Sequence, residues 1–172
     1  MGKTTVAGIL ANMGFLVTPE IATQVIQEGV FLPWVDHAAF QRECARRQLA
    51  MESILQNCGR DLVCDRGIHC LAAYRRVQGL DIVVPTKRGG YDVCFVFDEV
   101  PAWDNDGIRY EDPSFTREIT PYMTDAYEAK GVPVVRVPFM TPRDRAMFIL
   151  NKLSAAYPGF QAPVRQSLLQ AA

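Results

Sequence analysis

The chain carries little net charge and no sustained apolar run. It has 18 Lys and Arg against 19 Asp and Glu in 172 residues, which gives a net charge of −1. A protein that binds nucleic acid needs a basic stripe to neutralise phosphates, and this composition argues against that class. No apolar run approaches the roughly 20 residues of a membrane helix, and Val6 stands where a myristoylation signal has Ser or Thr. We therefore expect no nucleic-acid partner, no membrane association and a cytoplasmic location.

The cysteines contain no C-x-x-C pair and are odd in number. They are Cys44, Cys58, Cys64, Cys70 and Cys94. Three of them lie in apolar runs, which is typical of small buried thiols in a reducing compartment. The two histidines, His37 and His69, have no partner at metal-ligand spacing, so the sequence indicates no histidine metal site.

A phosphate-binding loop of the form G-x-x-x-x-G-K-[ST] is present only in its second half, as Gly2-Lys3-Thr4-Thr5. In the full motif the backbone N–H groups cradle phosphate, the Lys reaches the β- and γ-phosphates, and the hydroxyl holds Mg²⁺. Apolar residues recur at helical spacing from Val6 to Met13 and stop before Gly14. A helix that begins at the Lys-Thr pair would aim its N-terminal amides at a phosphate. The alternative is an ordinary exposed N-terminus.

Helical segments alternate with short β-branched runs along the chain. Helices are predicted over residues 5–12, 36–57, 114–130 and 142–156, with Asp112 and Thr141 as N-caps of the last two. Strands are predicted over residues 14–18, 61–64, 93–97 and 132–137. Because these strands are apolar without strict alternation, they are typical of a parallel sheet covered on both faces. We expect one α/β domain of three layers.

Acidic residues follow three of the predicted strands. Glu20 follows the first strand, Asp65 the second and Asp98 the third. Ligands of parallel sheets lie outside the carboxyl ends of the strands, where an Asp can hold a Mg²⁺-bound water or accept a substrate proton. The alternative is that Glu20 and Asp65 only cap the helices that follow them.

Taken in order, these residues resemble the P-loop kinase-like AAA domain family, which includes the ribosylnicotinamide kinase domain of the bifunctional NAD-biosynthesis regulator and many bacterial ATPases. The resemblance rests on residues 2–5, 14–22, 65–67, 73–74 and 91–92, and most specifically on the Asp-Gly-x-Arg-x-Glu-Asp run at 106–112. It implies an AAA domain over residues 1–156. Residues 157–172 form a tail without a family counterpart, for which disorder is an open alternative.

The resemblance implies ATP and Mg²⁺ as the cofactors. Lys3 would contact the β- and γ-phosphates, with Gly2 and Thr5 in the same loop. Thr4 and Asp65 would hold the Mg²⁺, directly or through water.

The resemblance also implies the residues that act on the acceptor. Glu20 would meet the acceptor hydroxyl, and Arg66 would lie near the acceptor or the phosphates. Arg109 belongs to a lid-like segment over residues 98–113, where its charge would stabilise the transferring phosphoryl group. The alternative is a surface arginine paired with Glu111 or Asp112.

This sequence departs from the family's pattern at the N-terminus. Family members carry a strand and the first loop glycine ahead of the residue at which this chain starts, and that strand is the central one of a sheet with the order 2-3-1-4-5. We expect a truncation within the loop, and the loss of three or four charged N–H contacts would weaken ATP binding on the order of 10³-fold or more. Restoring the upstream residues is expected to rescue binding.

The expected function is that of an ATP-binding P-loop protein. It is either an ATPase or a kinase that transfers the γ-phosphoryl group of Mg-ATP to a small, nucleoside-like acceptor. The alternatives are a non-catalytic nucleotide-binding regulatory module and an inactive fragment from a misplaced start.

Overall fold

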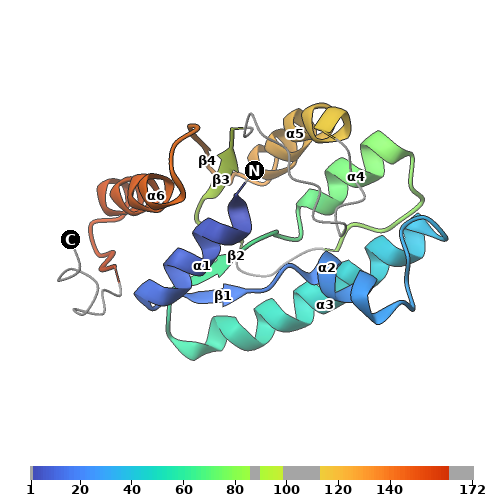
Figure 1. The fold of residues 1–172 in the computed structure, drawn as a ribbon, viewed down its shortest axis with the longest axis horizontal. Coiled ribbons are helices and arrows are strands. Elements are labelled where there is room, and N and C mark those ends of the chain that lie inside the picture. The colour runs from blue at the N-terminus through green and yellow to red at the C-terminus, as the bar shows by residue number, and fades with distance from the viewer. Residues whose placement is uncertain (1, 86–89, 99–112, 163–172) are drawn as a thin grey trace.

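The computed structural model describes residues 2–85, 90–98 and 113–162 of the chain. Within these ranges helices alternate with short strands (Figure 1). The helices are α1 (Lys3–Met13), α2 (Ile21–Glu28), α3 (His37–Leu55), the short 3₁₀ helix η1 (Gln56–Cys58), α4 (Cys70–Gln78), α5 (Pro113–Glu128) and α6 (Pro142–Ala156). The strands are β1 (Leu16–Thr18), β2 (Leu62–Cys64), β3 (Cys94–Phe97) and β4 (Val134–Val137).

Local sequence signals set the ends of several helices. Gly14 ends α1 with φ 112°, a conformation that glycine adopts without a steric penalty. The side chain of Asp36 accepts a hydrogen bond from the N–H of Ala39 at 2.9 Å and so caps α3. Thr141 caps α6 in the same way. Each such cap stabilises its helix by about 1 kcal/mol. The predicted bounds of α3 and α6 are therefore close to those in the structure.

No bounds were predicted from the sequence for two of the helices, the ones expected after Glu20 and after Asp65. α2 spans eight residues and α4 nine, which is too short for a long periodic pattern. α5 also continues through Pro121, a residue that usually ends or kinks a helix. Packing against neighbouring helices stabilises these segments, since α4 packs on α5 and α2 packs on α3.

The described strands form two separate parallel pairs. Leu16–Thr18 of β1 pairs in register with Leu62–Cys64 of β2, and Cys94–Phe97 of β3 pairs with Val134–Val137 of β4. The predicted α/β class with parallel strands is thus confirmed. Among the described residues β2 and β3 do not pair with each other, so the expected single three-layer sheet stays a prediction.

Helix α1 joins the two strand pairs. It lies centrally in Figure 1, packs against α6 and contacts both β1 and β2. Its buried Val6 and Leu10 belong to one core cluster with Phe15, Val137 and Ile149. Burial of a large apolar side chain contributes roughly 1.5–3 kcal/mol, so this cluster fixes the axis of α1 relative to the strands.

The first residues of the predicted tail pack against the domain. Phe160 stacks on Phe15 with ring centroids 6.0 Å apart. The hydroxyl of Tyr157 donates to the carbonyl oxygen of Asp92 at 2.6 Å. The rest of the tail, from residue 163, lies outside the described residues.

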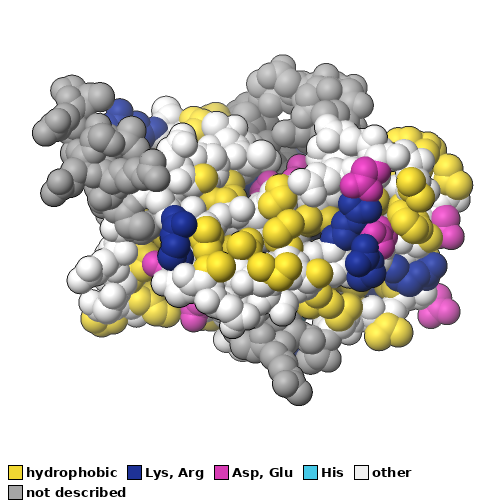
Figure 2. All heavy atoms as spheres, turned by 90° about the horizontal axis from the view of Figure 1, so that it is seen from below, with side chains coloured by type: hydrophobic (Ala, Val, Ile, Leu, Met, Phe, Trp, Pro, Cys, Tyr) yellow, Lys and Arg dark blue, Asp and Glu magenta, His cyan; other side chains and the backbone are white. Residues whose placement is uncertain are grey.

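None of the helices in the described ranges is both long and apolar enough to cross a membrane. All five cysteines are free thiols, of which Cys70 is buried and Cys58 is exposed. One face of the molecule carries a band of hydrophobic side chains beside a cluster of Lys or Arg and acidic side chains (Figure 2).

Candidate functional site

The N-terminus of α1 has the geometry of an anion-binding helix start. Gly2 has φ 70°, in the left-handed region that favours glycine, and no side chain within residues 2–85, 90–98 and 113–162 caps this end of the helix. The backbone N–H groups of Lys3, Thr4 and Thr5 have no acceptor inside the helix, because the first turn of every helix lacks one. These amides and the positive end of the helix dipole favour a negatively charged ligand.

Thr4 and Asp65 are brought together although 61 residues separate them in the chain. The hydroxyl of Thr4 donates to Oδ2 of Asp65 at 3.0 Å. The other carboxylate oxygen, Oδ1, is buried and has no hydrogen-bond partner among the described residues. A carboxylate oxygen without a partner beside a threonine hydroxyl is a donor set that suits a hard cation such as Mg²⁺. The predicted metal pair therefore lies together at the start of α1.

The structure argues against helix capping as the role of Asp65. The helix that follows it begins at Cys70, and the residue at its N-cap position is His69. Glu20 does occupy the N-cap position of α2, but its side chain makes no capping hydrogen bond to the helix backbone. Its Oε2 accepts instead from the hydroxyl of Thr23 at 3.1 Å. Both acids thus point their carboxylates toward other groups than the helix amides.

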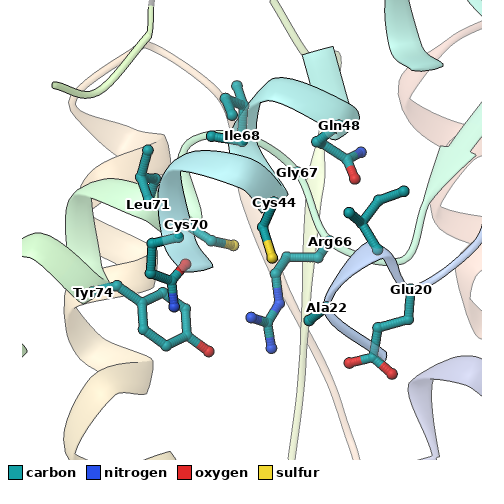
Figure 3. A pocket seen from close by; sticks show the side chains of 13 residues that line it. Glu20, Ala22, Cys44, Gln48, Arg66, Gly67, Ile68, Cys70, Leu71 and Tyr74 are labelled. Atoms are coloured by element: carbon teal, nitrogen blue, oxygen red, sulfur yellow. The ribbon is translucent and has the colours of Figure 1, made fainter. Parts of the chain in front are cut away.

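Glu20 and Arg66 line one small pocket (Figure 3). The pocket measures about 40 Å³ and lies between the start of α2, the middle of α3 and the segment after β2. The guanidinium of Arg66 stacks over the ring of Tyr74 with 5.1 Å between Cζ and the ring centroid. Figure 3 shows the polar ends of Glu20, Arg66 and Tyr74 directed toward the same side of the pocket.

Sequence reasoning missed the helix α3 and α4 residues of this pocket. Gln41 and Gln48 are buried polar residues on α3, and Cys44 lies between them in the sequence. Burial raises the pKa of the Cys44 thiol to about 12, and the positive charge of Arg66 opposes that rise. Polar residues at core-facing helical positions were the available signal, because burying such groups is costly without a partner. In the structure Gln48 donates to Glu52 at 2.6 Å, and Nε2 of Gln41 lies 3.2 Å from Nε2 of His37.

A second, larger cavity begins at the predicted phosphate site. It measures about 890 Å³, and its lining includes Lys3, Asp65 and Arg66. Four residues line both cavities: Arg66, Gly67, Cys70 and Tyr74. Lys3 and Asp65, predicted at the phosphates and the metal, therefore line the same cavity as Arg66, and Arg66 also lines the pocket of Glu20.

Arg145 of α6 is a further charged residue at this site that the sequence analysis did not identify. It is 2% exposed, and its guanidinium donates to the carbonyl oxygens of Pro138 at 3.0 Å and Asp98 at 3.1 Å. A Cβ added at Gly2 would lie 3.8 Å from Nη1 of Arg145, so this charge lies beside the start of α1. Burial lowers the pKa of the guanidinium, and the charge of Asp98 acts in the opposite direction. An arginine at a core position of α6, next to buried Ala146, was the available signal.

Among the described residues, three predicted site residues line neither cavity: Gly2, Thr4 and Thr5. Gly2 and Thr4 lie at the start of α1, where Thr4 contacts Asp65. Thr5 is exposed on α1 and contributes only its backbone N–H to the helix start. Arg109, together with the predicted lid over residues 99–112, lies outside the described residues.

The comparison with family models agrees with this geometry. A model described as an AAA domain matches residues 1–145. The chain belongs to the AAA domain family. This assignment supports a nucleotide-binding domain of P-loop type, and such domains generally bind ATP with Mg²⁺. No curated protein and no solved structure matches the chain. The closer resemblance to ribosylnicotinamide kinases stays a prediction.

Proposed function

We propose that the protein transfers the γ-phosphoryl group of Mg-ATP, either to water or to a small, nucleoside-like hydroxyl compound. The observation that carries this proposal is the contact of Thr4 with Asp65 at the start of α1, with one buried carboxylate oxygen that has no partner in the part of the chain that the structure describes. Membership of the AAA domain family supports the nucleotide. The donor set supports the metal.

The residues at the start of α1 have separate roles in this proposal. The N–H groups of Lys3, Thr4 and Thr5 bind phosphate oxygens, and Gly2 provides the left-handed turn that directs them. The ammonium group of Lys3 neutralises charge on the β- and γ-phosphates. Mg²⁺, when bound, supplies charge neutralisation and orientation of the same phosphates. Thr4 and Asp65 are the residues that would hold it.

The pocket between α2 and α3 is the proposed acceptor site. Glu20 orients the acceptor hydroxyl and receives its proton, and Arg66 binds the phosphoryl group or the acceptor from the side shared by the two cavities. A cavity of about 40 Å³ is much smaller than the roughly 300–1,000 Å³ of sites for small molecules. Acceptor binding therefore requires the surrounding side chains to move, and the α3 side chains Gln41 and Gln48 are placed to contact the acceptor.

We also propose that the positive charge of Arg109 stabilises the transferring phosphoryl group. This proposal rests on the resemblance of residues 106–112 to the family.

We further propose that the two strand pairs belong to one sheet in a three-layer domain. This proposal is supported by the parallel pairing within each strand pair and by the core cluster that α1 shares with residues of both pairs.

The test uses a loop-completed chain, in which a five-residue strand and the segment Gly-x-x-x-x precede Gly2. Nucleotide binding is measured by calorimetry with and without Mg²⁺, and phosphate release and transfer are followed with γ-labelled ATP. Lys3→Ala should lower kcat by about 10²–10³-fold, as expected for one charged group that stabilises the transition state. Thr5→Ser is the matched control, because it leaves the backbone amide in place.

Three outcomes separate the alternatives. Turnover that needs Mg²⁺ and Lys3 supports the proposal. Tight nucleotide binding with no release or transfer would identify a regulatory module instead. A loop-completed chain that folds but shows no Mg²⁺-dependent nucleotide binding contradicts the proposal.

A further inference from the structure

Asp65 and Arg66 lie on a short segment without regular secondary structure. This segment, residues 65–69, connects β2 to α4. The N–H group of Ile68 donates to a side chain, the hydroxyl of Tyr91, at 2.7 Å. The backbone that carries both charged residues is thus tied to a side chain 23 residues further along the chain than Ile68.

The hydrogen bonds of the Tyr91 hydroxyl have a fixed direction. A backbone N–H group can only donate, so the Tyr91 oxygen accepts from Ile68 and its single hydrogen is left for another acceptor. That acceptor is the carboxylate of Glu52 on α3, whose two oxygens lie 2.9 and 3.1 Å from the Tyr91 oxygen. Nε2 of Gln48, one turn earlier on α3, donates to the same carboxylate at 2.6 Å. This chain of hydrogen bonds, from Gln48 through Glu52 and Tyr91 to Ile68, is called the Glu52 relay below.

The centre of the Glu52 relay is buried. Glu52 is 1% exposed, and a buried carboxylate is costly unless it is hydrogen-bonded. Burial and the negative charge of Glu52 raise the pKa of Tyr91, which keeps its hydroxyl protonated and able to donate. Well-packed apolar side chains often stabilise a fold as well as a buried charged group does, so stability does not by itself account for a carboxylate at this position.

Gly67 brings the same segment against two tyrosines. A Cβ at this position would lie 2.8 Å from the Tyr91 hydroxyl oxygen and would overlap the hydroxyl of Tyr127. The rings of Tyr91 and Tyr127 pack with centroids 5.6 Å apart, and both contact the buried ring of His69. Figure 3 shows the side chain of Arg66 extending away from Gly67. The backbone directly after Arg66 is therefore held by close packing as well as by the relay.

The Glu52 relay connects the two cavities. Gln48 and Ile68 line the small pocket, and Tyr91 lines the large cavity. Arg66 and Gly67 line both. A shift of the relay would therefore displace residues at both proposed binding sites.

We propose that Glu52 and Tyr91 are positioning residues, which act through the N–H group of Ile68 to hold the segment that carries Asp65 and Arg66. The inference rests on the proposed function, because Asp65 and Arg66 are the residues that would meet the metal and the phosphates. A displacement of about 1 Å in such groups can lower a rate by about 10²-fold.

The first measurement needs no nucleotide. Amide hydrogen exchange is followed by NMR in the 172-residue chain, in Tyr91→Phe and in the matched control Tyr122→Phe, which also loses one hydroxyl and lines neither cavity. Tyr91→Phe should accelerate exchange at Ile68 by about 10-fold or more, because the acceptor of this N–H group is removed. The amide of Arg145, which donates to Thr141 at 2.9 Å, is the internal reference for folding. Unchanged exchange at Ile68 would refute the relay.

The second measurement is phosphate release or transfer by the loop-completed chain. Tyr91→Phe should lower kcat by about 10-fold or more and change the KM for Mg-ATP by no more than about threefold, because both charges remain and only their position changes. Glu52→Gln should retain at least about half of kcat, since its side-chain oxygen still accepts from Tyr91. Glu52→Leu removes that acceptor and should lose as much activity as Tyr91→Phe.

The outcomes separate the positioning role from the proposed function. Equal kcat in Tyr91→Phe and Tyr122→Phe, with Lys3→Ala strongly impaired, would refute the positioning role and leave the proposed function intact. If Tyr91→Phe does not fold, Glu52→Gln and Glu52→Leu give the same comparison, and equal kcat in these two refutes the role. A folded loop-completed chain without turnover would refute the proposed function instead, and exchange at Ile68 then decides the relay alone.

Discussion

The replacement Asp65→Asn should remove the Mg-ATP-dependent stabilisation of the loop-completed chain while leaving the unliganded fold intact. Asn has the shape of Asp and its side-chain oxygen can still accept from the Thr4 hydroxyl, which lies 3.0 Å from Oδ2 of Asp65. The substitution removes only the charge and one anionic oxygen from the pair. We therefore expect the free energy of unfolding without ligand to change by no more than about 1 kcal/mol.

The magnitude of the lost stabilisation follows from linkage. At a Mg-ATP concentration 100 times Kd, binding stabilises the native state by about 2.7 kcal/mol. Loss of one charged contact weakens binding by roughly 1.5–3 kcal/mol, which is about 10- to 150-fold in Kd. At the same ligand concentration the stabilisation then falls to between about 1.4 and 0.3 kcal/mol. The ligand-induced rise in Tm should shrink to between about one half and one tenth of its original size.

The assay is thermal unfolding of the loop-completed chain and of its Asp65→Asn variant, with and without Mg-ATP at one fixed concentration. Thr4→Ser is the matched control, because it keeps the hydroxyl and should retain most of the shift. The reasoning fails if Asp65→Asn keeps the full Mg-ATP shift. A large loss of Tm in the absence of ligand would show instead that Asp65 has a mainly structural role.

Three further outcomes are expected. Glu20→Gln should leave the Kd for Mg-ATP unchanged and lower phosphoryl transfer to an acceptor by about 10²-fold or more. Equal transfer rates would mean that the only role of the Glu20 side chain is its hydrogen bond with Thr23. Gly67→Ala should destabilise the fold by about 1–3 kcal/mol in urea unfolding, because a Cβ there would overlap the hydroxyl of Tyr127 and lie 2.8 Å from Cζ of Tyr91; an unchanged midpoint would contradict this packing. Cys44, whose pKa burial raises to about 12, should resist iodoacetamide at pH 8 while the exposed Cys58 reacts, as mass spectrometry of the labelled peptides can check; comparable labelling of both would disprove it.

The sequence by itself determined the order and type of the main elements. Capping residues such as Asp36 and Thr141, and glycines such as Gly14, act on their own helix ends, so their effect is visible without the rest of the chain. The apolar runs indicated parallel strands for the same local reason. The Gly-Lys-Thr-Thr motif indicated the P-loop-type family, which the match to an AAA domain over residues 1–145 confirms.

The tertiary structure alone decided which of these residues meet. The contact between Thr4 and Asp65 joins two segments 61 residues apart, and the pocket of Glu20 and Arg66 depends on how α2 packs on α3 and how α3 packs on β1. The buried position of Arg145 beside Gly2 likewise arises because α6 packs on α1. Such contacts depend on the relative placement of whole elements, which is fixed by the shared core of α1, α6 and the strands and not by any local pattern. For the same reason the division of the strands into two pairs, and the cavity between them, could not be read from residue patterns that describe each strand separately.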